Sequence, residues 1–127
     1  MIYGVGTDLV EIARIERALA RFGERFARHI LCAPELENFR ALRQPAPYLA
    51  KRIAAKEAFG KALGSGVRAP VDWHGVWVSH RDLGQPQLEF STAVAALLEA
   101  EGIRRAHLSL SDERSLASAT VILECDA

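Results

Sequence analysis

Three charged side chains in this sequence are of the types that hold a pyrophosphate. Asp8 follows two glycines in the segment YGVGTD, and Glu57 and Lys61 stand four residues apart in AAKEAFGKALG. Two carboxylates from separate elements are the usual protein contribution to a magnesium site, which leaves the other positions to water and phosphate oxygens. Lys61 follows Glu57 by one helical turn and would meet a phosphate as a point charge. These residues therefore predict a metal site that holds a pyrophosphate.

The same three residues also have plainer interpretations, which the residues alone leave open. Glu57 and Lys61 have the spacing of an exposed i,i+4 ion pair, which stabilises a helix by about 0.2–0.5 kcal/mol. Asp8 stands where its side chain would cap the helix that follows the first strand.

A helical wheel of the Glu57 segment puts mostly small side chains beside that carboxylate. Ala54 and Gly60 are examples, and we interpret them as room for a bulky ligand. The other two lysines of the chain, Lys51 and Lys56, point elsewhere on the wheel, so Lys61 is the lysine predicted to act on a phosphate.

A one-sided arginine stripe follows Asp8. If one helix runs from Ile12 to Ile30, five arginines share an arc of about 80°, and these are Arg14, Arg17, Arg21, Arg25 and Arg28. An apolar stripe lies opposite, formed by Ile12, Ile15, Leu19, Phe22, Phe26 and Ile30. The arginines are either a solvated helix face or a docking surface for an acidic partner helix or a polyanion.

The closing segment HLSLSDE places His107, Ser109 and Ser111 on one face of a strand and two leucines on the other. Ser109 has no triad order of histidine and aspartate around it, and the chain has no GxSxG elbow and no Walker loop. These absences argue against serine-hydrolase and P-loop chemistry.

Composition limits the classes of partner. Sixteen basic and sixteen acidic residues cancel, which argues against nucleic-acid binding through bulk charge. No apolar run approaches the roughly 18 residues of a membrane span, so we expect a cytoplasmic protein with no membrane partner. Cys32 and Cys125 lie far apart without a CxxC spacing, which predicts two buried thiols rather than a zinc site or a disulfide.

The periodicity of the chain predicts a single α+β domain over residues 1–127, with a mostly antiparallel sheet packed by helices. Trp73 and Trp77 are predicted on one strand face, in the core or in a subunit contact. Helices are expected at 12–30, 33–42, 48–63 with Gly64 as its end, and 91–102, and strands at 2–12, 73–80, 87–90, 105–112 and 117–125.

With these segments in view, the chain resembles the holo-[acyl-carrier-protein] synthase family, the small 4'-phosphopantetheinyl transferases. Four blocks carry the resemblance in order: GVGTDLVEIARIE, RIAAKEAFGKALG, GQPQLEF and HLSLSDERSLASATVILE. The resemblance implies transfer of 4'-phosphopantetheine from coenzyme A to a serine of apo acyl carrier protein, with release of adenosine 3',5'-bisphosphate, in fatty acid biosynthesis. It also implies a homotrimer with the nucleotide between neighbouring chains.

The resemblance further implies roles for individual residues. Asp8 and Glu57 match the metal ligands for Mg²⁺, Lys61 the lysine on the coenzyme A phosphates, and His107 the histidine that lines the nucleotide pocket. Glu57, Lys61 and His107 are thus the expected catalytic residues. The turn of Gly84, Gln85 and Pro86 matches the loop beside the adenine. The carrier protein would dock on the arginine stripe, through Arg14 with help from Arg17, Arg21 and Arg25.

Asp112 marks a departure, because many relatives have a second histidine there, and it puts the role of this position as an acid or base in doubt. The base that takes the serine proton is left open between Glu57 and a metal-bound water. Two rivals remain: a non-enzymatic module that docks an acidic protein, and a small magnesium-dependent pyrophosphohydrolase. A docking module would need no magnesium, and a pyrophosphohydrolase would cluster more carboxylates on the Glu57 helix.

Overall fold

The structure is a computed structural model, and it describes residues 1–126. It contains two antiparallel sheets and five helices in the order β1 (Ile2–Glu11), α1 (Ile12–Phe22), α2 (Glu24–Ile30), α3 (Ala33–Arg40), α4 (Ala46–Leu63), β2 (Val76–His80), β3 (Pro86–Phe90), α5 (Thr92–Ala100), β4 (Ile103–Glu113) and β5 (Leu116–Cys125). The larger sheet has the order β1-β5-β4 and the smaller one pairs β2 with β3. The predicted α+β fold with antiparallel strand pairing is confirmed, although the strands form two sheets rather than the one expected.

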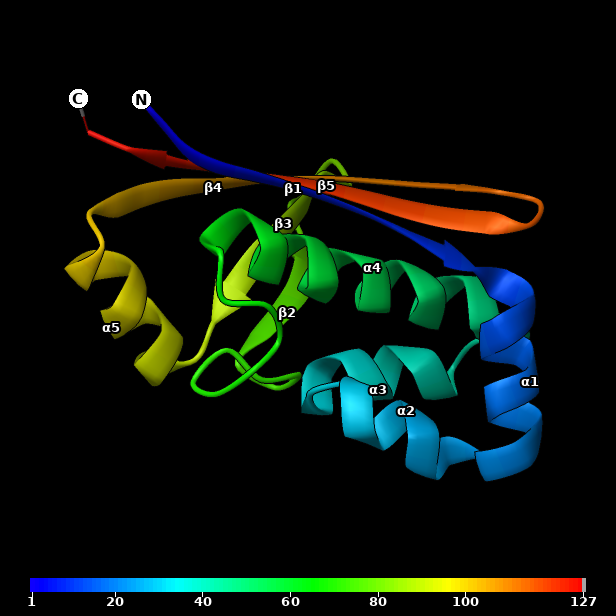
Figure 1. Cartoon of the computed structure of the whole chain (residues 1–127). Coiled ribbons are helices and arrows are strands. Elements are labelled where there is room, and N and C mark those ends of the chain that lie inside the picture. The colour runs from blue at the N-terminus through cyan, green and yellow to red at the C-terminus, as the bar shows by residue number, and fades with distance from the viewer. Residues whose placement is uncertain (127) are drawn as a thin grey trace.

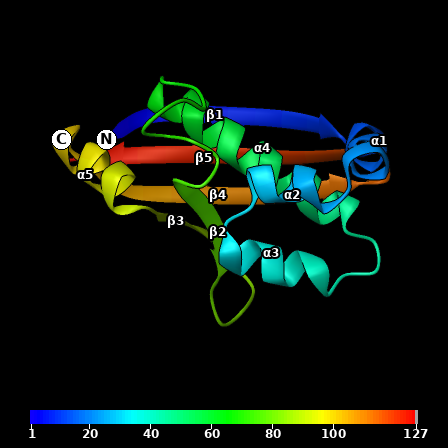
Figure 2. The same ribbon diagram turned by 90° about the horizontal axis from the view of Figure 1, so that it is seen from below.

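Helix α4 lies against one face of the larger sheet (Figure 1). Figure 2 shows α1 at one end of this sheet and α5 at the other. Within residues 1–126, the opposite face of the sheet carries no helix, and the β1 side chains that point there are exposed, including Val5 at 54% and Leu9 at 68%.

Two glycines of β1 explain how closely α4 approaches the sheet. A Cβ atom on Gly6 would lie 1.9 Å from the carbonyl oxygen of Ala58, and one on Gly4 would lie 2.0 Å from that of Ala62. Side chains alternate along a strand, so Asp8 also faces α4. The small residues of α4 are buried by the protein itself, so our interpretation of them as room for a bulky ligand was wrong.

The single helix predicted over 12–30 was also wrong, because the chain breaks at Gly23. Gly23 has φ 63° and ψ −152°, a conformation open to glycine and costly for other residues. The break takes Arg25 and Arg28 onto a second helix and leaves Phe22 half-exposed instead of in the apolar stripe. The guanidinium carbons of Arg21 and Arg25 lie 5.2 and 5.9 Å from the centre of the Phe22 ring.

The predicted ends of the later helices hold, but one predicted strand begins too early. Gly64 ends α4 in the left-handed conformation, and the Ser91 hydroxyl accepts a hydrogen bond from the Val94 amide at the start of α5. Trp73, however, precedes β2 in a turn rather than sharing a strand with Trp77. The Asp72 carboxylate accepts a hydrogen bond from the His74 amide there, a local turn that competes with strand pairing.

The two cysteines are free thiols, and each is half-buried rather than buried as predicted. Burial raises the pKa of the Cys32 thiol to about 11, so this side chain is a neutral thiol near neutral pH. None of the helices in residues 1–126 has the length and apolar character needed to span a membrane.

Candidate functional site

Asp8 and Glu57 line the same cavity, although 49 positions separate them in the chain. Strand β1 supplies Asp8, α4 supplies Glu57, and the cavity volume is about 440 Å³. Its lining is Asp8, Leu9, Val10, Arg14, Ile15, Phe26, Ile30, Ile53, Glu57 and Trp73. The fold therefore brings together the two carboxylates selected in the sequence. Most of the other residues that line the cavity are apolar.

Lys61 contacts one member of this pair, Asp8, from one turn beyond Glu57 on α4. Its ammonium donates hydrogen bonds to Asp8 Oδ1 at 3.0 Å and to the Thr7 carbonyl oxygen at 2.9 Å. The Asp8 side chain is 18% exposed and that of Lys61 is 53% exposed. A solvent-accessible ammonium thus rests on a largely buried carboxylate, and Asp8 does not cap α1, whose N-terminus has no side-chain cap.

The surroundings of Glu57 disfavour its negative charge. Burial raises the pKa of this carboxyl above its usual value, and the negative charge of Asp8 raises it further, while Lys61 acts in the opposite direction. Two hard oxygen donors that repel each other suit Mg²⁺, which keeps several water or phosphate ligands. Within residues 1–126 no cluster of three or more His, Cys, Asp or Glu side chains is arranged to hold a metal ion. A cation at this place would take side-chain ligands from Asp8 and Glu57.

The break at Gly23 divides the arginines of the predicted stripe between two helices. Arg14 lines the carboxylate cavity, whereas Arg17 and Arg21 lie exposed further along α1. Arg25 and Arg28 follow the break at Gly23 on α2. The cationic surface thus begins at the cavity and bends with the chain.

His107 lies away from Asp8 and Glu57 in the single chain. Its side chain is on the uncovered face of the sheet, while the neighbouring Leu108 and Leu110 pack toward the core as predicted. There the imidazole Nε2 contacts Glu124 Oε1, and Arg105 Nε donates to the same oxygen at 3.2 Å. These two hydrogen bonds lower the pKa of Glu124.

The turn of Gly84, Gln85 and Pro86 also lies outside this cavity. It joins β2 to β3, with Gly84 at φ 91° and the Gln85 carbonyl oxygen accepting from the Arg81 amide. The structure therefore brings together Asp8, Glu57 and Lys61, and leaves the predicted nucleotide contacts at separate places on one chain.

Helix α4 also carries a buried arginine that the sequence pattern does not predict. Arg52 is 4% exposed, and its guanidinium carbon lies 3.8 Å from the centre of the Tyr48 ring. Among residues 1–126, its Nε atom has no hydrogen-bond partner. Burial lowers the pKa of Arg52. Nothing in the sequence separates this arginine from the exposed ones, because only packing buries it.

Asp112, whose role was in doubt, has a structural partner. The Lys51 ammonium lies 3.0 Å from Asp112 Oδ1, so α4 is paired with the end of β4. Asp112 does not line the carboxylate cavity.

Comparison with known proteins decides the family. The model of the 4'-phosphopantetheinyl transferase superfamily matches residues 4–119. The chain belongs to this superfamily. The transferase is 52% identical to the holo-[acyl-carrier-protein] synthase of Nitrosospira multiformis over 98% of this chain and 99% of that one. It is 54% identical to that of Vibrio cholerae, with 98% of both chains covered.

Solved structures agree with this assignment. The transferase superposes on the holo-[acyl-carrier-protein] synthase of Neisseria meningitidis with a TM-score of 0.94 and 45% identity, over 98% of this chain and 99% of that one. Superposition on the Bacillus anthracis synthase in complex with coenzyme A (3',5'-ADP) gives a TM-score of 0.84 at 34% sequence identity, with 99% of both chains covered. The resemblance noted in the sequence is confirmed over nearly the whole chain.

Proposed function

We propose that this transferase moves the 4'-phosphopantetheine group of coenzyme A onto a serine of apo acyl carrier protein, in fatty acid biosynthesis in the cytoplasm. The observation that carries the proposal is the cavity in which Asp8 and Glu57 meet, with Lys61 at its edge. Its supports are the family assignment and relatives at about half identity that are named holo-[acyl-carrier-protein] synthase.

The reaction is a displacement at phosphorus. The serine oxygen bonds to the phosphorus that carries the pantetheine arm, and the bond from that phosphorus to the bridging oxygen breaks. Adenosine 3',5'-bisphosphate leaves and the serine proton is lost. Such a transfer needs positioning and charge neutralisation more than covalent chemistry by the protein.

The side chains of the cavity can perform these tasks. Glu57 is suited to accept the serine proton, because a raised pKa makes a carboxylate a better base. Lys61 neutralises negative charge that develops on the departing phosphate. Asp8 and Glu57 would hold Mg²⁺, which when bound supplies charge neutralisation for the pyrophosphate oxygens.

A mass measurement tests the function directly. Apo acyl carrier protein incubated with this chain, coenzyme A and Mg²⁺ should gain the mass of one phosphopantetheine group, and adenosine 3',5'-bisphosphate should appear in equal amount. A carrier protein whose acceptor serine is alanine should gain nothing, and a chelator should stop the reaction. An unchanged carrier mass in the complete mixture would refute the proposal.

Lys61→Met should tighten metal binding while slowing transfer. The ammonium competes with a metal ion for Asp8, and an ion pair of this exposure is worth at most about 1 kcal/mol, or roughly fivefold in affinity. Calorimetry with Mn²⁺ should therefore show an up to roughly fivefold lower Kd. Lys51→Met is the control, because its partner Asp112 lies outside the cavity. Weaker Mn²⁺ binding by Lys61→Met would contradict this role.

Docking of the carrier protein is proposed for α1 and the start of α2. The exposed Phe22 ring between the Arg21 and Arg25 guanidinium groups combines apolar and cationic surface, which suits an acidic amphipathic helix. Arg14 lies at the cavity end of the same helix, with Arg17 between.

Arg21→Glu should raise the KM for the carrier protein about tenfold or more, because it converts attraction into like-charge repulsion. The KM for coenzyme A should stay unchanged, and steady-state kinetics measure both. Arg104→Glu is the control, since Arg104 lies on β4 at the other end of the sheet from α1. Equal effects of the two variants would refute docking on α1.

A homotrimer is proposed because one chain does not assemble the whole site. His107 and the Gly84 turn lie apart from the carboxylate cavity, so a neighbouring copy would have to supply the nucleotide contacts. The uncovered face of the larger sheet presents Val5 and Leu9 for such an interface.

Val5→Lys should dissociate the assembly to single chains and raise the KM for coenzyme A. Light scattering on a sizing column measures the mass. Leu42→Lys is the matched control, because Leu42 is an exposed leucine just after α3 and lies outside the larger sheet. A wild-type mass of one chain would contradict the proposed trimer.

A further inference from the structure

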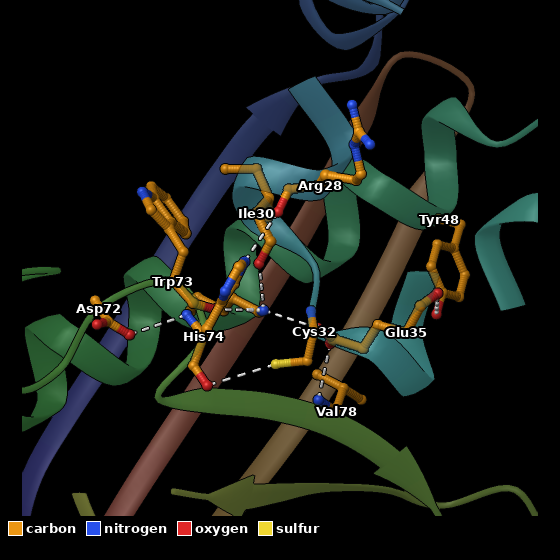
Figure 3. Close-up of polar contacts among 10 residues, drawn as sticks. Arg28, Ile30, Cys32, Glu35, Tyr48, Asp72, Trp73, His74 and Val78 are labelled. Atoms are coloured by element: carbon orange, nitrogen blue, oxygen red, sulfur yellow. Dashed lines mark hydrogen bonds and ion pairs between the residues drawn. The ribbon is translucent and has the colours of Figure 1, made fainter. Parts of the chain in front are cut away.

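Lys56, the neighbour of Glu57 on α4, is the centre of a buried polar cluster. Its side chain is 0% exposed, and its ammonium lies 2.7 Å from Glu35 Oε1, whose residue is 1% exposed. The same nitrogen donates to the carbonyl oxygens of Ile30 and Trp73, each at 2.7 Å. All three ammonium protons therefore have partners, which come from three separate segments (Figure 3).

Glu35 is equally well satisfied. Its Oε1 also accepts from the Cys32 amide at 3.1 Å, and its Oε2 accepts from the Val78 amide at 3.0 Å. The cluster thus connects α3, α4 and β2 with the end of α2 and with the turn that contains Trp73.

Stability alone is a weak reason for this pair. Removing two charges from water is costly, and apolar pairs of similar volume are often as stable as a buried ion pair or more stable. What an apolar pair cannot do is hold particular carbonyl groups at fixed positions. The function of the Lys56–Glu35 pair is therefore indicated by the two carbonyl groups to which Lys56 donates.

Ile30 and Trp73 both line the cavity that contains Asp8 and Glu57. Ile30 is the last residue of α2, where backbone carbonyls lack partners within the helix. Trp73 belongs to a turn rather than to a strand. His74 Nε2, 2.9 Å from the Arg28 carbonyl oxygen, forms a second bond between the same two segments. The end of α2 and the Trp73 turn, neither of which is held by a sheet, are thus tied to the helix that carries Glu57.

We infer that Lys56 is a positioning residue, which sets the shape of the coenzyme A cavity by anchoring the Ile30 and Trp73 carbonyls to α4. This inference rests on the proposed function. Lys56 does not itself line the cavity, so its effect is exerted through Ile30 and Trp73, which do. Loss of these two hydrogen bonds should weaken the binding of coenzyme A and leave the docking of the carrier protein on α1 unaffected.

The test separates positioning from stability with a double variant. Lys56→Met alone leaves the Glu35 charge buried and uncompensated, so it should melt well below the wild type. Lys56→Met with Glu35→Gln removes both charges and should regain much of the lost melting temperature. We expect this double variant to keep a KM for coenzyme A at least about tenfold above the wild type, with the KM for the carrier protein within about twofold.

Two further variants serve as controls. Glu35→Gln alone retains both carbonyl anchors and should keep a KM for coenzyme A near the wild-type value despite a lower melting temperature. Leu98→Ala removes buried core on α5, away from the cavity, and should lower stability without moving that KM. If the methionine double variant does not fold, Lys56→Leu in the Glu35→Gln background carries the same test, because leucine also lacks an N–H donor for the two carbonyls.

A wild-type KM for coenzyme A in the folded double variant would overturn the inference. A rise of this KM in Glu35→Gln alone that equals the rise in the double variant would also overturn it. Calorimetric binding of coenzyme A to each variant measures the cavity without turnover. A wild-type chain that binds coenzyme A but transfers nothing would instead count against the proposed function, and the binding comparison would still decide the role of Lys56.

Discussion

Glu57→Gln is expected to lower transfer by at least about a thousandfold while the protein stays folded. The amide cannot accept the serine proton and is a poor ligand for Mg²⁺, so both tasks proposed for this position fail together. The measurement is kcat/KM for holo carrier protein formed, with circular dichroism to show that the helices remain. Glu37→Gln, an exposed carboxylate on α3, is the matched control. Near-normal turnover by Glu57→Gln would eliminate Glu57 both as base and as metal ligand.

The same variant has an expected effect on stability, and its sign follows from the pKa of Glu57. Burial and Asp8 raise this pKa in the folded chain, so ionising Glu57 is harder in the folded than in the unfolded state. Its contribution to stability is therefore complete at low pH and is lost as pH rises through the folded-state pKa. Glu57→Gln should melt at or above the wild-type temperature near neutral pH, and the difference should vanish in acid. A lower melting temperature at neutral pH would contradict the raised pKa.

Gly6→Ala is expected to be the most destabilising single-methyl change in the β1 strand. The new Cβ would lie 1.9 Å from the Ala58 carbonyl oxygen and 2.7 Å from the Ala62 nitrogen, both backbone atoms of α4. The backbone of a packed helix and that of a paired strand cannot each shift by this much within one or two residues. We therefore expect α4 as a whole to move away from the sheet. We expect a loss of about 3 kcal/mol or more in the free energy of unfolding, measured in urea.

The displacement should also reduce activity, because α4 carries Glu57 and Lys61 and β1 carries Asp8. Thr7→Ala is the control, since Thr7 is the next residue of β1 and its side chain points to the uncovered face. An unchanged unfolding free energy for Gly6→Ala would show that α4 does not pack on β1 as closely as described.

Much of the architecture is readable from local pattern. The alternation in β1 and β4, the end of α4 at Gly64 and the Ser91 cap depend on residues within a few positions, and the structure confirms each of them. Asp8, Glu57 and Lys61 were also selectable from residue type and spacing. Their roles as metal ligands and phosphate contact stay predictions, although Asp8 and Glu57 line one cavity and Lys61 is hydrogen-bonded to Asp8.

The local pattern misled where packing decides the outcome. The apolar stripe through Phe22 has helical spacing, yet one glycine ends the helix and leaves that ring exposed. Lys56 was set aside because its position on the wheel lies away from Glu57, and that same position points it into the protein, at Glu35.

The sequence by itself determined the fold class, the family and the three side chains at the candidate site, because strand and helix periods and motif order are properties of neighbouring residues. Only the tertiary structure decided what the small residues of α4 are for, where Lys56 and Arg52 lie, and that His107 is on the face of the sheet opposite Asp8. The reason is physical: the burial and partners of a side chain depend on segments distant in sequence, whose contact is set by how whole elements pack.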